Sequence, residues 1–255
     1  MEIKNKTAMV TGGASGLGAA TVRRIIAGGG NVIIMDVNEI GGQALASELG
    51  KAAGFIKCDV TAEEDINKAI QKAKDLFGGV HFCINCAGSG WAERTVSKNG
   101  PHNLSTFEKI VRLNLIGTFN VASKSAFAMT ANTPDENGER GVIVNVASAA
   151  AFEGQIGQTS YAASKGGVVA LTLPMARDLS GLGIRVATIA PGLFNTPLMA
   201  MVPKDYAKAL GESVPFPRRL GLPEEFALLV ESILVNPYIN GETIRLDGAL
   251  RMAPR

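Results

Sequence analysis

The sequence predicts an α/β fold in which one doubly wound parallel sheet carries helices on both faces. Short apolar runs of strand length alternate along the chain with longer segments whose apolar residues recur every three or four positions. A glycine-rich turn, residues 11–18, follows the first run, and an acidic residue ends the second. Because crossovers between parallel strands are right-handed, this alternation places helices on both sides of the sheet.

The composition supports a single large core without an obvious macromolecular partner. The chain has 255 residues, of which 46% are hydrophobic and 19% charged, and its formal net charge is +2. So small a charge argues against nucleic acid as a partner, and the apolar runs are too short to span a membrane. The polar segment 1–6 leads directly into a strand, so we expect a cytoplasmic protein, or one of the mitochondrial matrix if the source is eukaryotic.

The cysteines indicate neither disulfides nor a metal site. Three cysteines are too few for a disulfide framework. Cys83 and Cys86 have Cys-x-x-Cys spacing, but no second pair exists to complete a zinc site. We therefore expect reduced thiols and no bound metal.

The first strand, the glycine-rich turn and the helix that follows predict a dinucleotide site. Gly12 and Gly16 let the backbone approach a pyrophosphate closely, and Gly18 lets the helix pack against the strand. The first amides of the helix would bind the phosphate oxygens. Asp36 ends the second strand and can accept hydrogen bonds from both hydroxyls of an adenosine ribose. Because its carboxylate would repel a 2′-phosphate, NAD is favoured over NADP.

The remaining elements continue the alternation. The predicted strands occupy residues 8–10, 31–36, 55–60, 80–86, 141–147, 184–190 and 243–246. Predicted helices with one apolar face follow after the glycine-rich turn and at 61–77, 105–129, 161–179 and 224–235. The patterns at 61–64 and 105–108 are typical of capping boxes. Ligands of such sheets bind at the carboxyl ends of the strands, so the residues there are candidate site residues.

Ser148, Tyr161 and Lys165 are the candidate catalytic residues. Ser148 follows a predicted strand, and Tyr161 and Lys165 share one face of the next helix. A phenol of pKa ~10 needs a drop of about 3 units, or roughly 4 kcal/mol, to act as a base at neutral pH. One cation ~4 Å away supplies about that much at an effective dielectric of ~20. We therefore expect Tyr161 to be the base and Lys165 to lower its pKa, although such a pair is also common on ordinary amphipathic helices.

Two further side chains belong to this prediction. Ser148 would hydrogen-bond the substrate oxygen and stabilise the charge that develops there. Asn114 lies among apolar neighbours in the segment 105–129, so it is either a satisfied core amide or part of the site.

These residues resemble the motifs of the short-chain dehydrogenase/reductase family over essentially the whole chain. The matching motifs are Thr11-Gly12-x-x-x-Gly16-x-Gly18, Asn85-Cys86-Ala87-Gly88, Asn114, Ser148, Tyr161-x-x-x-Lys165 and Pro191-Gly192. The one departure is Cys86, where many members of the family have a second Asn. The resemblance implies a single Rossmann-type domain over residues 1–255, a homotetramer, and a proton relay in which Asn114 anchors a water that leads to Lys165.

The resemblance also implies which residues bind NAD. They are Gly12, Ser15, Gly16, Leu17, Gly18, Asp36, Asp59, Val60, Asn85, Cys86, Ala87, Gly88, Tyr161, Lys165, Pro191, Phe194 and Thr196.

Several stretches are similar to the branch of that family that acts on 3-hydroxyacyl-CoA esters. They are residues 151–155, 172–179, 190–194, 214–217 and 240–249, together with the polar insertions 93–103 and 131–140. The similarity implies oxidation of (3S)-3-hydroxyacyl-CoA to 3-oxoacyl-CoA, with hydroxysteroids as further candidate substrates. It places Gln155 on the substrate side with Ser148 and Tyr161.

The segment 193–220 is apolar and interrupted by prolines, which suits a lid over an acyl chain and equally an ordinary piece of core or interface. The side chains expected to cover the chain are Phe194, Leu198, Met199, Met201 and Val202.

Two alternatives stay open. A 3-oxoacyl-carrier-protein reductase of the same family would normally use NADPH and a basic side chain near Ala14, Ser15 or Val37, where this chain has none. A non-catalytic scaffold on this fold is the other alternative, and the complete set of candidate catalytic residues argues against it as the sole role.

Overall fold

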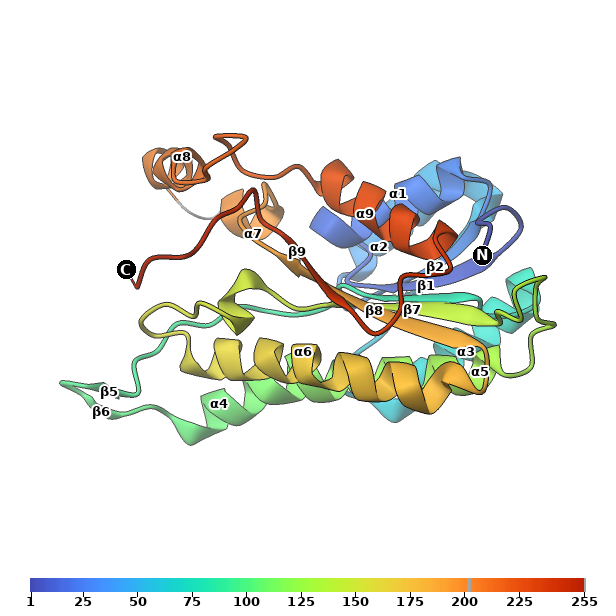
Figure 1. Ribbon diagram of the computed structural model, residues 1–255, viewed down its shortest axis with the longest axis horizontal. Coiled ribbons are helices and arrows are strands. Elements are labelled where there is room, and N and C mark those ends of the chain that lie inside the picture. The colour runs from blue at the N-terminus through green and yellow to red at the C-terminus, as the bar shows by residue number, and fades with distance from the viewer. Residues whose placement is uncertain (201–202, 255) are drawn as a thin grey trace.

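A seven-stranded parallel sheet forms the centre of the computed structural model, which describes residues 1–200 and 203–254 (Figure 1). The strand order is β3-β2-β1-β4-β7-β8-β9. The strands are β1 (Thr7–Thr11), β2 (Asn31–Asp36), β3 (Ala53–Lys57), β4 (Phe82–Asn85), β7 (Gly141–Val146), β8 (Ile184–Pro191) and β9 (Thr243–Leu246). The order reverses between β1 and β4, which opens a crevice at the carboxyl ends of these strands. The predicted α/β fold is confirmed.

Helices cover both faces of the sheet, as Figure 1 shows. One face carries α1 (Gly16–Ala27), α2 (Glu39–Leu49) and α9 (Pro223–Val235). The other carries α3 (Glu63–Phe77), α5 (Gly117–Met129) and α6 (Thr159–Ser180). No helix within the described ranges combines the length and apolar character needed to cross a bilayer.

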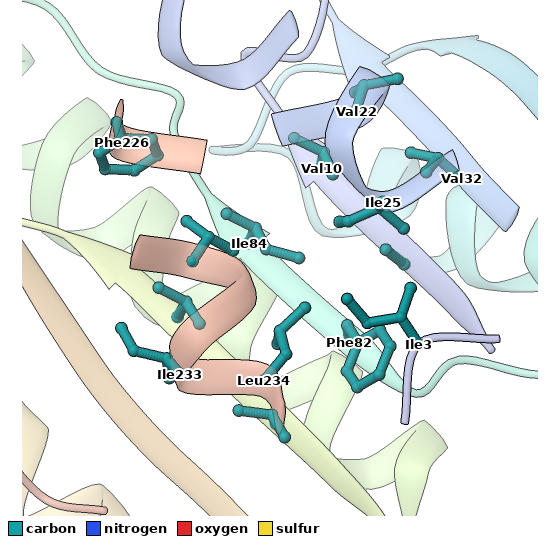
Figure 2. Packing of buried hydrophobic residues seen from close by; sticks show 14 of the residues in the cluster. Ile3, Val10, Val22, Ile25, Val32, Phe82, Ile84, Phe226, Ile233 and Leu234 are labelled. Carbon is teal, nitrogen blue, oxygen red and sulfur yellow. The ribbon is translucent and has the colours of Figure 1, made fainter. Parts of the chain in front are cut away.

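The strands read as continuous apolar runs because both faces of the sheet are buried. In β1, Val10 packs into the core under α1 and α9, while its neighbour Met9 packs into the core on the opposite face. Figure 2 shows the first of these cores, where Ile25 of α1 and Ile233 of α9 meet side chains of the central strands.

The helix predicted over residues 105–129 has three parts. It begins as α4 (Leu104–Val111), continues as one π-helical turn (Arg112–Ile116) and ends as α5. Asn114 lies in the π turn, a local widening that often marks functional sites.

Both predicted capping boxes are wrong: α4 is capped by Asn103 instead, and α3 has no side-chain cap. Asn103 caps α4 by accepting hydrogen bonds from the backbone amides of Ser105 and Thr106. The Thr61 hydroxyl donates to Asp59, and α3 begins two residues later without a side-chain cap.

Three features that the sequence pattern did not predict lie at the end of the sheet where the strands terminate. They are the hairpin β5 (Val96–Ser97) and β6 (Gly100–Pro101), and the helices α7 (Pro197–Ala200) and α8 (Lys204–Glu212). The C-terminal end of the chain reaches the same end of the molecule (Figure 1). Met201 and Val202, which were expected to face an acyl chain, lie outside the described residues.

Candidate active site

The glycine-rich turn after β1 forms one side of a cleft at the carboxyl ends of the strands. Gly12 and Gly16 have φ angles of +61° and +51°, in the left-handed region that glycine adopts at low cost. A Cβ at Gly18 would stand 2.2 Å from the carbonyl oxygen of Gly12, so only glycine lets α1 start this close to the turn. Ser15 precedes α1, and in the described chain its side chain makes no capping bond, which leaves the first amides open to an anion.

Asp36 stands at the end of β2 and faces the same cleft. Its two carboxylate oxygens accept hydrogen bonds from the amides of Ala14 at 3.0 Å and Asn38 at 2.9 Å. Each oxygen keeps a lone pair for a further donor. Among the described residues that line the cleft, none is Lys or Arg. A phosphate group at this point would therefore meet a carboxylate with no cation to offset it.

The cleft gathers most of the residues predicted to bind NAD. It is lined by Gly12, Ser15, Gly16, Leu17, Gly18, Asp36, Asp59, Val60, Cys86, Ala87, Gly88 and Thr196. Its lining also contains residues that the sequence pattern had not assigned to a cofactor, namely Met35, Val37, Cys58, Leu113 and Pro197. All five are immediate chain neighbours of predicted site residues, which is the signal that could have found them.

The other residues predicted to bind NAD lie outside this lining, namely Asn85, Tyr161, Lys165, Pro191 and Phe194. Asn85 is buried in β4 and donates from Nδ2 to Oδ1 of Asn145 at 2.9 Å. Pro191 is buried as the last residue of β8. The side chain of Phe194 packs into the core, edge-on to Phe226 with ring centroids 6.4 Å apart. The expectation that Phe194 covers an acyl chain is therefore corrected: its ring anchors the start of the segment 193–220.

Ser148 and Tyr161 come together beyond the carboxyl end of β7. The Ser148 Oγ accepts a hydrogen bond from the amide of Ala150 at 3.1 Å, at the start of a 3₁₀ turn (Ala149–Ala151). Burial raises the pKa of the Tyr161 phenol above its usual range, and a hydrogen bond with the Ser148 side chain opposes this shift. Tyr161 is therefore protonated at neutral pH.

Lys165 is buried one helical turn further along α6, with 5% of its surface exposed. Its Nζ donates to the carbonyl oxygen of Val146 at 2.8 Å, and burial lowers its pKa to about 8. In this structure burial is the larger effect on the pKa of Tyr161, and the ammonium is bonded to the end of β7. That Lys165 and the nicotinamide charge together bring this pKa down to the neutral range stays a prediction.

Gly88 connects Lys165 to the cleft. A Cβ at Gly88 would stand 3.3 Å from the Lys165 Nζ and 3.0 Å from the Asn114 Oδ1, so both side chains lie against this glycine. Gly88 itself lines the cleft. The ammonium of Lys165 therefore extends from α6, the helix that also carries Tyr161, to the edge of the cleft.

Asn114 is fully buried, and its amide is satisfied by protein groups. Its Oδ1 accepts from the Ser89 amide at 2.9 Å, and its Nδ2 donates to the Ser89 carbonyl and to the Ser164 Oγ, both at 3.0 Å. The Ser164 hydroxyl donates in turn to the carbonyl oxygen of Tyr161 at 2.7 Å. Asn114 thus connects the loop after β4 to the backbone of Tyr161. Ser164 was not predicted, although its place next to Lys165 in the sequence pointed to it.

Gln155 lies in the loop between Ser148 and Tyr161. Its side-chain Nε2 donates to the carbonyl oxygen of Ala253 at 3.0 Å, and its backbone amide donates to Oε1 of Gln158 at 3.0 Å. The side chain is thus bound to the C-terminal end of the chain, and its contact with a substrate stays a prediction.

Together these groups can exchange a proton with a substrate oxygen beside a cleft built for a dinucleotide. Among the described residues, no cluster of His, Cys, Asp or Glu is placed to hold a metal ion.

Comparison with known proteins agrees with this chemistry. Residues 6–207 match the family model described as short chain dehydrogenase. The chain is 53% identical over 254 residues to 3-hydroxyacyl-CoA dehydrogenase type-2 of Drosophila melanogaster, which covers 99% of this chain and 100% of the fly protein. The crystal structure of 3-hydroxyacyl-CoA dehydrogenase type-2 from Mycobacterium avium is similar, with a TM-score of 0.96, 48% identity and 98% of each chain covered. A 3-oxoacyl-[acyl-carrier-protein] reductase of Aquifex aeolicus is more distant, at 30% identity over 98% of this chain and 100% of the reductase.

Proposed function

Because the chain belongs to the short-chain dehydrogenase family, we propose that it interconverts (3S)-3-hydroxyacyl-CoA and 3-oxoacyl-CoA esters with NAD. The observation that carries the reaction is the buried ammonium of Lys165, which lies against Gly88 of the cleft one helical turn from Tyr161. The Tyr161 phenol in turn interacts with the Ser148 side chain. Similarity along the whole chain to proteins named 3-hydroxyacyl-CoA dehydrogenase type-2 supports the substrate class.

The residues of the cleft fit NAD. The glycine-rich turn leaves no room for a Cβ at Gly18, and the open amides at the start of α1 would hold the pyrophosphate. The free lone pairs of Asp36 would accept hydrogen bonds from the adenosine ribose. Lys165 has N–H donors beyond its bond to Val146, and these would hold the nicotinamide ribose. When bound, NAD supplies the hydride acceptor.

Tyr161 and Ser148 would handle the proton and the substrate oxygen. The raised pKa keeps Tyr161 protonated at neutral pH, which is the form that donates a proton to a ketone oxygen. Oxidation of the alcohol needs the phenolate, so it should be the harder direction at neutral pH. Because the Ser148 Oγ accepts from Ala150, its own hydroxyl hydrogen can be donated to the substrate oxygen as negative charge develops there.

We extend the proposal to a homotetramer. Large apolar side chains on the outer surfaces of α5 and α6 support contacts between copies, among them Phe119, Phe127 and Leu173. Phe127 is 80% exposed, which is costly for a side chain of this size in an isolated subunit. Light scattering coupled to gel filtration would measure the mass in solution.

The proposed function is tested by kcat/KM for acetoacetyl-CoA with NADH and with NADPH. We expect NADH to be preferred by at least about 100-fold, because repulsion between the Asp36 carboxylate and the 2′-phosphate of NADPH is worth a few kcal/mol. A strong preference for NADPH would instead support the carrier-protein reductase. A panel of 3-hydroxyacyl-CoA esters and hydroxysteroids with NAD would then rank the substrates, and no turnover of any of them would support a scaffold.

A further inference from the structure

The loop that connects the 3₁₀ turn after Ser148 to α6, residues 152–158, is bound by the C-terminal end of the chain. The guanidinium of Arg245 donates to both carboxylate oxygens of Glu153, at 2.6 and 2.7 Å. Further along, the Gln155 side chain donates to the Ala253 carbonyl, and the Ile156 amide donates to the Pro254 carbonyl at 3.0 Å. Residues more than ninety positions apart in the sequence therefore hold this loop. We call residues 245–254 the C-terminal segment.

Arg245 is the centre of this attachment. Besides Glu153, it donates to Asp247 at 2.7 Å and to the Leu250 carbonyl at 3.1 Å, and its guanidinium carbon lies 5.0 Å from the centre of the Phe152 ring. The Arg245 and Glu153 side chains are only 20% and 26% exposed. A bidentate, partly buried ion pair of this kind is strong and geometrically specific. The pair with Arg245 also lowers the pKa of Glu153, so the carboxylate stays charged at working pH.

The opposite side of the loop is also held. The Glu93 amide donates to the Gly157 carbonyl at 2.7 Å, and the hydroxyls of Thr95 and Thr159 lie 3.2 Å apart. The loop is therefore clamped between the insertion that carries β5 and β6 and the C-terminal segment.

The clamp acts on the loop and not on the reacting groups themselves. Ser148 is oriented by the Ala150 amide, and the Tyr161 backbone by Ser164, neither of which contacts Arg245. What the clamp fixes are the apolar side chains of the loop, Phe152 and Ile156, which are 47% and 46% exposed. Phe152 is held directly by the Arg245 guanidinium. A loop with apolar side chains between the two catalytic positions is suited to contact an acyl chain.

We propose that Arg245 and Glu153 are positioning residues for acyl-CoA binding, and that the C-terminal segment, acting through them, sets how loop 152–158 presents its apolar side chains to the substrate. This inference rests on the proposed function. It assigns a role to the C-terminal segment, which lies far in sequence from every predicted site residue.

The test compares Arg245→Gln with a matched control. We expect Arg245→Gln to raise KM for a long-chain 3-oxoacyl-CoA about tenfold, while kcat and the Kd of NADH stay within about twofold. The two parallel hydrogen bonds from the guanidinium fork to Glu153 are lost, but Ser148 and Tyr161 keep their partners. KM for acetoacetyl-CoA, whose chain is short, should rise less. Arg245→Lys keeps the charge without the fork and should lie between the wild type and Arg245→Gln.

Arg24→Gln is the control, because Arg24 forms a partly buried ion pair with Glu231 between α1 and α9, away from the loop. It should leave KM unchanged. Hydrogen exchange of the peptide 152–158 supplies a readout that needs no turnover, and we expect it to be about tenfold faster in Arg245→Gln and unchanged in Arg24→Gln.

The outcomes separate the two proposals. If the wild type does not turn over acyl-CoA esters, the proposed function fails, whatever the exchange rates show. If the wild type is active but KM and loop exchange are the same in Arg245→Gln, or if Arg24→Gln raises KM equally, the positioning role is refuted.

Discussion

The ammonium of Lys165 donates a hydrogen bond to the carbonyl oxygen of Val146, at 2.8 Å, and so connects helix α6 to the end of strand β7. Burial lowers the pKa of this ammonium to about 8, so it is mainly charged at neutral pH. The same Nζ lies against Gly88 at the edge of the cleft. One side chain thus fixes the helix that carries Tyr161 and places a cation where a cofactor ribose would bind.

Lys165→Met should reduce catalysis and cofactor binding together. The variant removes the cation and its donors but keeps an apolar stem of similar length, so α6 should still pack. We expect kcat/KM to fall at least about 100-fold and the Kd of NADH to rise about tenfold, as for the loss of charged hydrogen bonds. Fluorescence titration with NADH measures the binding. Lys124→Met, which removes a surface ion pair with Glu63, is the control and should change neither quantity.

The pKa of Tyr161 predicts different pH profiles for the two directions. Because burial raises that pKa, the phenolate is the minor form at neutral pH, and its fraction grows about tenfold for each pH unit below the pKa. The kcat/KM for alcohol oxidation should therefore rise from pH 6 to about 8, where loss of the Lys165 proton begins to oppose it. Ketone reduction, which uses the protonated phenol, should be flat over this range. An oxidation rate independent of pH would contradict the assignment.

Tyr161→Phe should abolish turnover and leave NADH binding largely intact, because the ring keeps its packing and only the proton donor is lost. Ser148→Ala should keep some activity, with kcat lower by about 10²–10³, as for the loss of one oxyanion donor. Steady-state rates and NADH titrations of both variants distinguish these effects. Turnover by Tyr161→Phe close to that of the wild type would remove the phenol from the mechanism.

Asp36→Asn should relax the preference for NADH. The amide oxygen of Asn can still accept from one of the two backbone amides, Ala14 or Asn38, that bond the carboxylate, so part of this turn should persist. The repulsion of a 2′-phosphate disappears, and we expect the ratio of kcat/KM for NADH over NADPH to fall about tenfold or more. The matched control is Asp75→Asn on α3, which should leave the ratio unchanged. An unaltered ratio in Asp36→Asn would show that the discrimination lies elsewhere in the cleft.

The parts of this structure that follow from local pattern were predictable. The ranges of β2 and β9 agree with the runs 31–36 and 243–246 to the residue. For β2 the reason is that a strand buried on both faces needs a nearly uninterrupted apolar sequence. The glycine-rich turn was predictable because a Cβ there would overlap the backbone. These constraints act over a few residues.

The features that local pattern does not reveal depend on long-range contacts. Phe194 was expected at a lid, but its ring packs in the core against Phe226, where the missing side chain of Gly221 leaves room for it. The Gln155 side chain is bound by a carbonyl 98 positions away. The high pKa of Tyr161 depends on how deeply the phenol is buried, which a four-residue spacing on a helix does not reveal.

The buried ion pair of Glu139 and Arg185 should be the most sensitive point of the fold outside the site. Arg185 lies on β8, and its guanidinium donates to Glu139 and to the carbonyl oxygens of Ile233 and Leu234 near the end of α9. Both side chains are less than a tenth exposed. Glu139→Gln leaves a buried guanidinium without its counter-charge, so we expect the free energy of unfolding to fall by about 3–5 kcal/mol.

Urea denaturation followed by circular dichroism measures this loss. Glu48→Gln is the matched control, because it breaks an ion pair with Arg23 in which both side chains are about half exposed. Such surface pairs contribute about 0–1 kcal/mol, so this variant should unfold close to the wild type. The Glu139→Gln and Arg185→Met double variant should recover part of the loss, because the guanidinium of Arg185 is then no longer buried without a counter-charge. If Glu139→Gln were as stable as Glu48→Gln, water would have to reach the Glu139–Arg185 pair. Its contribution to the stability of the fold would then be refuted.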